Sequence, residues 1–327
     1  MFFRLLIVPI LLLIIIGLLL FGLIYNSIRL IRRKAKRRHI VGLALSVSII
    51  LFFTYGFTLG FEAFNVKHVE LDSADLPASF DGYKIVMFTD AHVGNFAGHR
   101  QWMVKRAVDS INAQHPDAIV FCGDIMNADP AELKPFVGML SSLKARDGVY
   151  SVLGNHDYSL YKRDISEEEM RKLNEKLRQS ERSFGWHLLM NENAIIRRDA
   201  DSIVFAGEEN DGNGPFPCYA DAAKTMAGIN DSSYVIMLQH DPSAWRRQVL
   251  PQTNAQLTLS GHTHAGQISL FGWSPTSLIY EENCGVYRQG DRILYVSSGL
   301  GGVVPFRIDF PGEIVVITLH SIAKGRQ

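Results

Sequence analysis

Two long apolar runs open the chain, and neither is broken by the polar positions that an amphipathic helix or strand would show. The first extends from Leu5 to about Tyr25, and the second, from Ile40 to Phe61, contains no charged residue. Each is close to the ~20 residues that a helix needs to cross ~30 Å of hydrocarbon. Buried soluble helices are rarely so apolar on every face, and a cleaved signal peptide has a shorter apolar core followed by small residues. We therefore expect an anchor of residues 1–61 with two transmembrane helices, at about 5–25 and 40–61.

A basic segment separates the two runs. Seven of the ten residues from Arg29 to Arg38 are Arg or Lys. Positively charged loops between spans stay in the cytoplasm, so we expect the loop 29–39 to be cytoplasmic. The anchor would then be a hairpin in the inner membrane, with residues 62–327 extracytoplasmic. A patch for nucleic acid or phosphoinositide is the alternative for such a run, but the two flanking spans explain it more simply.

Beyond the anchor, short apolar strands first alternate with helices and then follow one another with less helix between them. Helices are expected at Gln101–Asn112, Pro130–Leu143 and Ser166–Arg182. Strands are expected at Tyr83–Thr89, Ala118–Cys122, Val149–Leu153, Ser202–Ala206, Tyr234–Leu238, Gln256–Leu259, Ile293–Val296 and Ile314–Leu319. This order predicts an α/β (α+β) domain over 83–327, with two packed sheets and helices outside. Residues 62–82 are expected to form a linker and an edge strand.

The overall charge balance hides an asymmetry between these parts. The chain has 33 basic and 33 acidic residues, but residues 1–61 hold eight of the basic and none of the acidic ones. Residues 62–327 therefore carry 25 basic against 33 acidic side chains, a net charge of −8. An acidic domain is a poor binder of the phosphate backbone, so we expect no nucleic-acid partner.

The three cysteines match no zinc-binding spacing. Cys122 lies in an apolar strand and is interpreted as a small core residue. Cys218 and Cys284 fall in loop-like stretches, and an extracytoplasmic location would permit a disulfide between them.

Side chains able to bind a divalent metal follow five of the predicted strands. They are Asp90, His92, Asp124, Asn155, His240, His262 and His264. Each alone could be a turn residue or a buried core group. Ligand sites in α/β sheets lie just outside the carboxyl ends of the strands, and independent turns would not select metal ligands at every strand end. We expect these seven side chains to converge.

The local pattern around these residues supports a metal site. The i, i+2 spacing of Asp90 and His92, and of His262 and His264, would point both members the same way along extended backbone. Glycines at 123, 154 and 261 permit close approach of the chain before each ligand. Carboxylate, amide and imidazole donors without thiolate favour a divalent metal such as Mn, Fe or Zn in a site with open coordination positions.

In their order along the chain, these motifs resemble the calcineurin-like metallophosphoesterase superfamily. The matching elements, over roughly 64–320, are Asp90-x-His92, Gly123-Asp124, Gly154-Asn-His-Asp157, His240 and Gly261-His262-x-His264. The anchor and the form of residues 261–267 most resemble bacterial, envelope-associated members of the YkuE/YaeI type.

The resemblance implies a fold, a ligand set and a substrate class. The fold is a β-sandwich of two mixed sheets flanked by helices, and the substrate is a phosphoester. One metal would be held by Asp90, His92 and His264, the other by Asn155, His240 and His262, with Asp124 bridging the two ions.

Such a pair of ions lowers the pKa of a shared water and clamps the phosphoryl oxygens. His156, which the ligand set does not need, is the candidate general acid or oxyanion donor. Asp157 could orient that imidazole, but a helix cap is the preferred interpretation.

The second motif departs from the superfamily's protein phosphatases. Asn127 stands where they carry a second Asp, and no Arg follows it. This favours a phosphodiesterase acting on a small or envelope-associated substrate. The alternatives are a glycolipid-intermediate pyrophosphatase with a cytoplasmic domain and a non-catalytic membrane scaffold.

Two further segments each allow two interpretations, one structural and one functional. Gly299–Gly302 is more consistent with a turn than with a phosphate loop, since no Lys-Ser/Thr pair follows. The aromatic residues in 273–289, among them Trp273, Tyr280 and Tyr287, could contact substrate or simply pack. No protein partner can be inferred.

Overall fold

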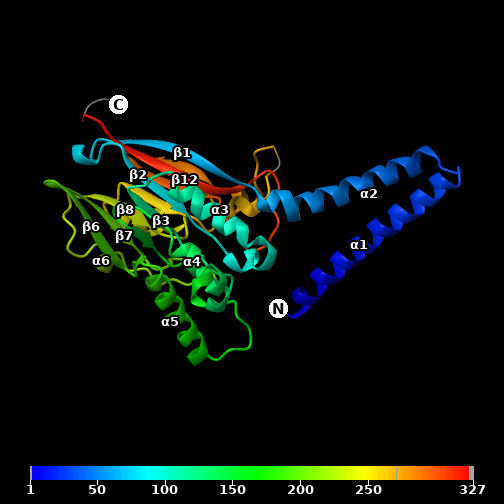
Figure 1. Ribbon diagram of the computed structural model, residues 1–327, viewed down its shortest axis with the longest axis horizontal. Helices are drawn as coiled ribbons and strands as arrows, with labels where there is room; N and C mark the ends of the chain where they lie inside the picture. The colour runs from blue at the N-terminus through cyan, green and yellow to red at the C-terminus, as the bar shows by residue number, and fades with distance from the viewer. Residues whose placement is uncertain (1, 270, 324–327) are drawn as a thin grey trace. The chain divides into compact units, whose positions relative to one another are not determined.

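The structure is a computed structural model that describes residues 2–269 and 271–323. The chain divides into two compact units, one ending at Leu59 and the other beginning at Gly60. In the first unit, α1 (Phe2–Ile31) and α2 (Arg37–Tyr55) lie side by side as a helical hairpin, and a π-helical turn, Gly56–Gly60, continues α2 (Figure 1). The side chains of residues 1–16 lie outside the description.

One described helix, Arg37–Gly60, is long and apolar enough to cross a membrane. It matches the span expected at 40–61. In α1, the apolar segment Gly17–Ile31 is shorter than a span. The other part of the span predicted at 5–25 consists largely of residues whose side chains are not described.

The second unit contains two six-stranded sheets. The first has the order β1 (Phe64–Ser73), β12 (Gly312–Ser321), β2 (Tyr83–Phe88), β3 (Ala118–Phe121), β4 (Val149–Ser151), β5 (His187–Leu188). The second has the order β10 (Gly285–Gln289), β11 (Arg292–Val296), β9 (Leu257–Ser260), β8 (Tyr234–Leu238), β7 (Asp201–Gly207), β6 (Glu192–Arg198). Both are mixed: β2 is parallel to β3 and antiparallel to β12, and β8 is parallel to β9 while β6 is antiparallel to β7.

Alternation along β2 shows how the layers are held together. Ile85 and Met87 are fully buried between the two sheets, together with Ile236 of β8. Val86 and Phe88 point the other way, into a core shared with α3 (Gln101–Asn112). Because both faces of the strand are covered, it is apolar at nearly every position.

Helices cover the outer faces of the sandwich. α5 (Glu167–Ser183) joins α3 on the first sheet through Leu177. The second sheet is covered by Trp245 and Val249, which precede the short helix α7 (Leu250–Gln252). The predicted arrangement of two mixed sheets flanked by helices is therefore confirmed.

Several details differ from the prediction. The helix expected over Pro130–Leu143 is a 3-10 helix, Pro130–Phe136, followed by a single turn, α4 (Val137–Leu140). Pro135 inside it lacks the N–H that an α-helical ladder needs. β5, β6 and β10 were not predicted: β5 has only two residues, and β6 and β10 are edge strands with weak apolar patterns.

Candidate metal centre

The seven predicted ligand residues follow the carboxyl ends of five central strands. Asp90 and His92 come after β2, Asp124 after β3, Asn155 after β4, His240 after β8, and His262 and His264 after β9. All are buried except His262, which is partly exposed. Two sheets thus contribute to one site.

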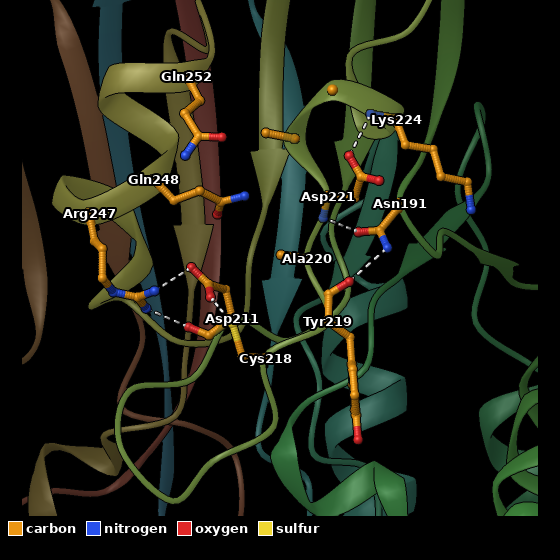
Figure 2. A pocket seen from close by; sticks show the side chains of 12 residues that line it. Asn191, Asp211, Cys218, Tyr219, Ala220, Asp221, Lys224, Arg247, Gln248 and Gln252 are labelled. Carbon is orange, nitrogen blue, oxygen red and sulfur yellow. Dashed lines mark hydrogen bonds and ion pairs between the residues drawn. The ribbon is translucent and has the colours of Figure 1, made fainter.

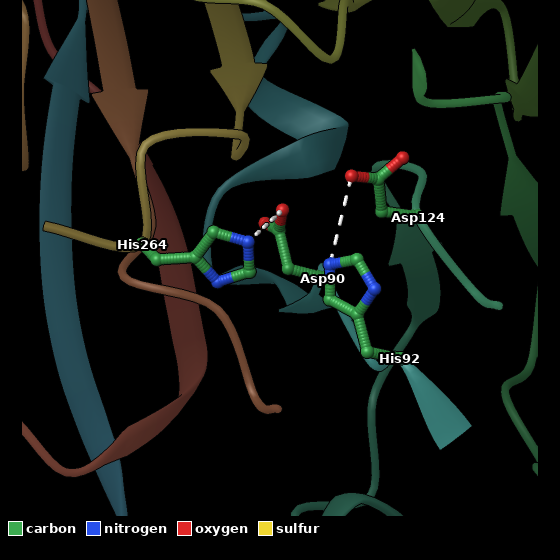
Figure 3. A group of neighbouring side chains, drawn as sticks. All are labelled: Asp90, His92, Asp124 and His264. Atoms are coloured by element: carbon green, nitrogen blue, oxygen red, sulfur yellow. Dashed lines mark ion pairs between the residues drawn. The ribbon is translucent and has the colours of Figure 1, made fainter. Parts of the chain in front are cut away.

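Four of these side chains form a tight group, shown in Figure 3. Asp90, His92, Asp124 and His264 each offer a ligand atom, and the four atoms lie within 4.8 Å of one another. Nε2 of His92 is 3.6 Å from Oδ2 of Asp124, and Nε2 of His264 is 3.3 Å from Oδ1 of Asp90. The spacing is that of donors arranged around one cation.

The remaining three lie on the other side of Asp124. Nε2 of His240 is 3.3 Å from Oδ2 of Asp124, and Nδ1 of His262 is 2.8 Å from Oδ1 of Asn155. The His240 and His262 ring centroids are 5.2 Å apart. Asp124 therefore lies between two groups of donors, with contacts to both.

The backbone that brings these residues together is not the extended chain that the i, i+2 spacing led us to expect. Asp90, His92, His262 and His264 have φ values of 51°, 42°, 71° and 51°, which is the left-handed region. Asp and His enter this region more readily than most residues, but each such conformation still costs on the order of 1–3 kcal/mol. Each pair converges through a tight left-handed turn, which the surrounding contacts hold in place.

Two glycines allow the loops to approach closely. Gly123 has φ 92°, and a Cβ there would lie 2.8 Å from Nδ1 of His240. A Cβ on Gly154 would collide with the carboxylate of Asp124. A side chain at either position would force the loops after β3 and β4 apart.

Most of the site is protonated in a way that suits cation binding, and His240 is the exception. Burial would lower the pKa of His240, but the Asp124 carboxylate raises it to about 10, so a cation bound there would displace a proton. Burial lowers the pKa of His92 to about 3 and that of His262 to about 4, so both imidazoles are neutral at pH 7. Burial alone would raise the pKa of Asp124, but the neighbouring imidazoles, His240 foremost, hold it well below the usual range. Neutral imidazoles and ionised carboxylates are the forms that bind metals.

Unpartnered nitrogen atoms point to the same conclusion. Both ring nitrogens of His92, Nε2 of His240 and Nδ1 of His264 are buried without a hydrogen-bond partner. A buried polar atom without a partner carries a desolvation cost of about 1–3 kcal/mol. Divalent cations bound among these donors would supply the missing interactions, so the residues fit a metal pair.

Asp157 does more than the helix cap that we preferred from the sequence. Its buried carboxylate accepts hydrogen bonds from the backbone N–H groups of Gly154 (2.9 Å), Asp124 (2.7 Å) and Ile125 (3.0 Å). It therefore closes its own turn and also fixes the loop that carries Asp124. No contact with the His156 ring accompanies these bonds among the described residues, so the alternative of orienting that imidazole is not supported.

The His156 ring is oriented by a main-chain group. Its Nδ1 lies 2.6 Å from the carbonyl oxygen of Asn127. A carbonyl can only accept, so Nδ1 carries the proton and Nε2 is free for other contacts. The ring is edge-on to His92, with centroids 4.8 Å apart, and stacked on Tyr161 at 4.1 Å. Asn127 stands where the superfamily's protein phosphatases carry a second Asp, and here its backbone carbonyl is the partner of the imidazole.

Three aromatic residues lie beside the metal donors. The sequence analysis did not single out two of them, Tyr161 and Phe216, and it did not decide between substrate contact and packing for Tyr280. Tyr161 accepts a hydrogen bond from Nδ2 of Asn155 (2.8 Å), and the Tyr280 hydroxyl is 2.8 Å from Nε2 of His262. Phe216 is edge-on to the His262 ring at 4.8 Å. Phe216 lies in a loop far from any ligand motif, and Tyr161 lies six residues after Asn155, so the fold is needed to show that both rings stand beside the donors.

The glycine run Gly299–Gly302 forms a turn against the Asp90 loop. The backbone N–H of Gly301 donates to the carbonyl of Asp90 at 2.9 Å. The buried Arg307 guanidinium holds this turn by donating to carbonyls that include those of Gly299 and Phe310. Burial lowers the Arg307 pKa to about 10, so it is charged at pH 7. Its donors are occupied by the main chain, which leaves none of them for a substrate phosphate.

Figure 2 shows a separate cavity of about 680 Å³, lined by none of the seven ligand residues. Its polar groups bind one another: Arg247 pairs with Asp211 at 2.8 Å, and Nδ2 of Asn191 donates to the carbonyl of Tyr219 at 2.9 Å. Cys218, in the wall, is a free thiol that donates to Asp211, and Cys284 is also free, so the disulfide considered above is not formed. We assign this cavity no part in the chemistry.

Two layers of sheet with carboxylate and histidine donors at their strand ends define a candidate metal-binding protein. A family model, the calcineurin-like phosphoesterases, matches residues 83–266, and the chain belongs to this family. Calcineurin-like phosphoesterases use two divalent metal ions, and the Asp/His cluster needed to hold them is present. The predicted family and cofactors are therefore confirmed, and membership supports phosphoric ester hydrolase activity.

Relatives with membrane anchors and bacterial relatives both align with most of the chain. The "transmembrane protein with metallophosphoesterase domain" of Danio rerio is 30% identical over 295 residues, covering 85% of this chain and 62% of that protein. The metallophosphoesterase YkuE of Bacillus subtilis (strain 168) is 29% identical over 277 residues, covering 82% of this chain and 90% of YkuE. The Bos taurus protein of the same description as the first is 30% identical, covering 78% of this chain and 57% of its own. The chain thus spans about three fifths of the vertebrate relatives' length.

Proposed function

We propose that the protein is a dinuclear-metal phosphodiesterase that acts on a small or envelope-associated phosphoester. The observation that carries the proposal is the convergence of six donor side chains around Asp124, with several of their imidazole nitrogens buried and without a hydrogen-bond partner. A scaffold without activity would have no use for such costly polar burial.

The donors divide into two sets that share one carboxylate. Asp90, His92 and His264 would hold one ion, and Asn155, His240 and His262 the other. Asp124, with contacts of 3.6 Å to His92 and 3.3 Å to His240, would bind both. Two divalent ions bound there supply Lewis-acid activation of a water and neutralisation of phosphoryl charge.

His156 is the chain's own group for proton transfer. The Asn127 carbonyl holds one proton on Nδ1, so Nε2 donates to the developing oxyanion or to the leaving oxygen when the ring is an imidazolium, protonated on both nitrogens. The stacked Tyr161 ring limits the rotation of the imidazole. General acid catalysis of this kind contributes ~10²–10⁴-fold.

The substrate preference rests on what surrounds His156. A phosphomonoester at neutral pH carries more charge than a diester and benefits from an additional guanidinium. No Arg follows the second motif, and Arg307 binds carbonyls. A diester, with less charge to neutralise, is the better match. A glycolipid pyrophosphatase is the second candidate. Its substrate also lies at a membrane, and the negative charge of that substrate is distributed over two linked phosphoryl groups.

Metal removal and restoration tests the proposed activity. Chelation of the full-length protein should abolish hydrolysis of bis(4-nitrophenyl) phosphate, and Mn²⁺, Fe²⁺ or Zn²⁺ should restore it. Under the same conditions 4-nitrophenyl phosphate should be hydrolysed more slowly. Unchanged hydrolysis after chelation, at a metal content verified to be near zero by mass spectrometry, would exclude the metal-dependent mechanism.

The apolar helix Arg37–Gly60 and the transmembrane relatives support a membrane location. We further propose two spans in the inner membrane and an extracytoplasmic catalytic domain, because the basic loop 29–39 favours the cytoplasm. Alkaline phosphatase fused after Gln327 should be active, whereas a fluorescent protein that matures only in the cytoplasm should be dark. The opposite pair of signals would place the domain inside.

A further inference from the structure

We propose that an apolar rim beside the metal centre inserts into the surface of the bilayer that holds α2, and that the site takes amphiphilic phosphoesters lying at headgroup level. The rim is defined by six exposed side chains: Phe271, Trp273, Leu278, Ile279, Val303 and Val304. The substrate clause rests on the proposed phosphodiesterase activity, whereas the insertion rests on the proposed membrane location and not on that activity.

The exposure of these side chains is unusual for a soluble surface. Phe271 is fully exposed, and Leu278 and Ile279 each expose 77% of their surface. Neither rim segment, 271–280 or 297–306, contains a charged residue. Contiguous exposed apolar surface marks interaction sites, and Trp is favoured where apolar and aqueous phases meet. The sequence left open whether the aromatic residues of 273–289 simply pack, and for Trp273 the 47% exposure shows that it does not.

The two rim segments lie together and adjoin the site. Nε2 of Gln267 donates to the carbonyl oxygens of Val304 (2.7 Å) and Phe306 (2.8 Å), which ties the second segment to the metal-ligand loop. The first segment ends at Tyr280, whose hydroxyl is 2.8 Å from Nε2 of His262. A substrate reaching the metal donors from this side would pass the rim.

Strand register places the membrane attachment at the same end of the sandwich. β12 is antiparallel to β2, so it begins beside the carboxyl end of β2, where Asp90 follows. β1 is parallel to β12, with Phe64 opposite Gly312, and therefore also begins at this end. The start of β1 and the loops that carry the rim occupy the same end of the second unit in Figure 1.

The connection to the apolar helix is short. Three residues separate Gly60, the end of that helix, from Phe64, the start of β1. At ~3.3–3.6 Å per residue, these two positions lie within about 15 Å of each other whatever the orientation of the two units. The start of β1, at the metal-centre end of the domain, is therefore tethered close to the end of the helix that we propose to span the bilayer, and this tether is our reason for choosing lipid as the occupant of the rim.

The charge of the domain distinguishes insertion of the apolar rim from electrostatic adsorption to anionic lipid. Residues 62–327 carry a net charge of −8, and the rim segments carry none. Attraction to anionic lipid is therefore not the driving force, and burial of apolar area is. The rim should enter zwitterionic phosphatidylcholine as well as anionic bilayers.

Quenching by brominated lipid tests the insertion. The full-length protein, with exposed Trp102 replaced by Phe, is placed in phosphatidylcholine nanodiscs whose acyl chains carry bromine. Trp186 and Trp245 are buried, so quenchable emission reports Trp273. We expect bromine to quench this emission, Leu278→Glu with Ile279→Glu to reduce the quenching by about half or more, and Trp273→Phe to remove it.

Ile195→Glu is the matched control, because Ile195 is 44% exposed on β6, the opposite edge of the second sheet. It should leave the quenching unchanged. Emission of Trp273 that is quenched by aqueous acrylamide but not by brominated lipid would overturn the proposal. Equal quenching in the Leu278→Glu, Ile279→Glu protein would overturn it as well.

Activity in the same nanodiscs tests the substrate clause. The double variant should hydrolyse soluble bis(4-nitrophenyl) phosphate at the wild-type rate but a lipid-borne aryl phosphodiester about tenfold more slowly. Equal loss on both substrates would reject the clause. Absence of hydrolysis in the wild-type protein would reject the proposed function, while the quenching result would still decide the insertion.

Discussion

Replacement of Asp124 by Asn should lower kcat/KM for bis(4-nitrophenyl) phosphate by roughly 10³-fold or more. The side chain is buried, and its carboxylate contacts an imidazole from each of the two sets of donors. An amide has the same shape but no negative charge, so it cannot balance two dications. Steady-state kinetics and the metal content per chain measure the effect, and we expect about one ion to be lost.

Asp129→Asn is the matched control for this substitution. It makes the same change of charge five residues away, where Asp129 pairs with Lys162 and accepts a hydrogen bond from the backbone N–H of Ala131. Asn can still accept that bond, so activity should remain within about twofold of wild type. An Asp124→Asn protein as active as the wild type would refute the dinuclear mechanism.

Replacement of His156 by Ala should lower kcat by ~10²–10⁴-fold while both metal ions stay bound. The imidazole is outside the two sets of donors, and its Nδ1 is committed to the Asn127 carbonyl. Loss of the ring therefore removes a proton donor without removing a ligand. Kinetics combined with metal analysis separates the two consequences.

The dependence on the leaving group shows whether the lost function is proton donation. A nitrophenolate leaves without protonation, whereas an alkoxide does not, so the defect of His156→Ala should be at least about tenfold larger on an alkyl ester. His68→Ala, at an exposed position on β1, is the control and should leave both rates unchanged. An equal defect on both esters would exclude His156 as the acid that protonates the leaving group.

Much of the domain was predictable because its strands are buried on both faces. β2, β3, β8 and β9 are short, nearly unbroken apolar runs, and each is followed by a ligand residue. That pattern depends only on local sequence and on the rule that sites lie at the carboxyl ends of strands. The weak edge strands β6 and β10 could not be found this way, because their alternation resembles that of a loop.

The ligand types were also readable from sequence, but the path of the backbone was not. Left-handed φ values at Asp90, His92, His262 and His264 replace the expected extended chain. They persist because long-range contacts hold them, among them the hydrogen bond of 3.1 Å from the His262 N–H to the Asp90 carboxylate. A conformation imposed by a residue 172 positions away leaves no mark in the local pattern.

The sequence by itself determined the apolar N-terminal segments, the order of the central strands and the positions of seven candidate donors, since these depend on composition and spacing. Only the tertiary structure decided that Asp157 fixes the Asp124 loop, that Tyr161 and Phe216 stand beside the donors, and that the apolar rim shares one end of the domain with the start of β1. Each of these depends on how loops and strand ends pack against one another, and that packing is set by strand register and tertiary contacts.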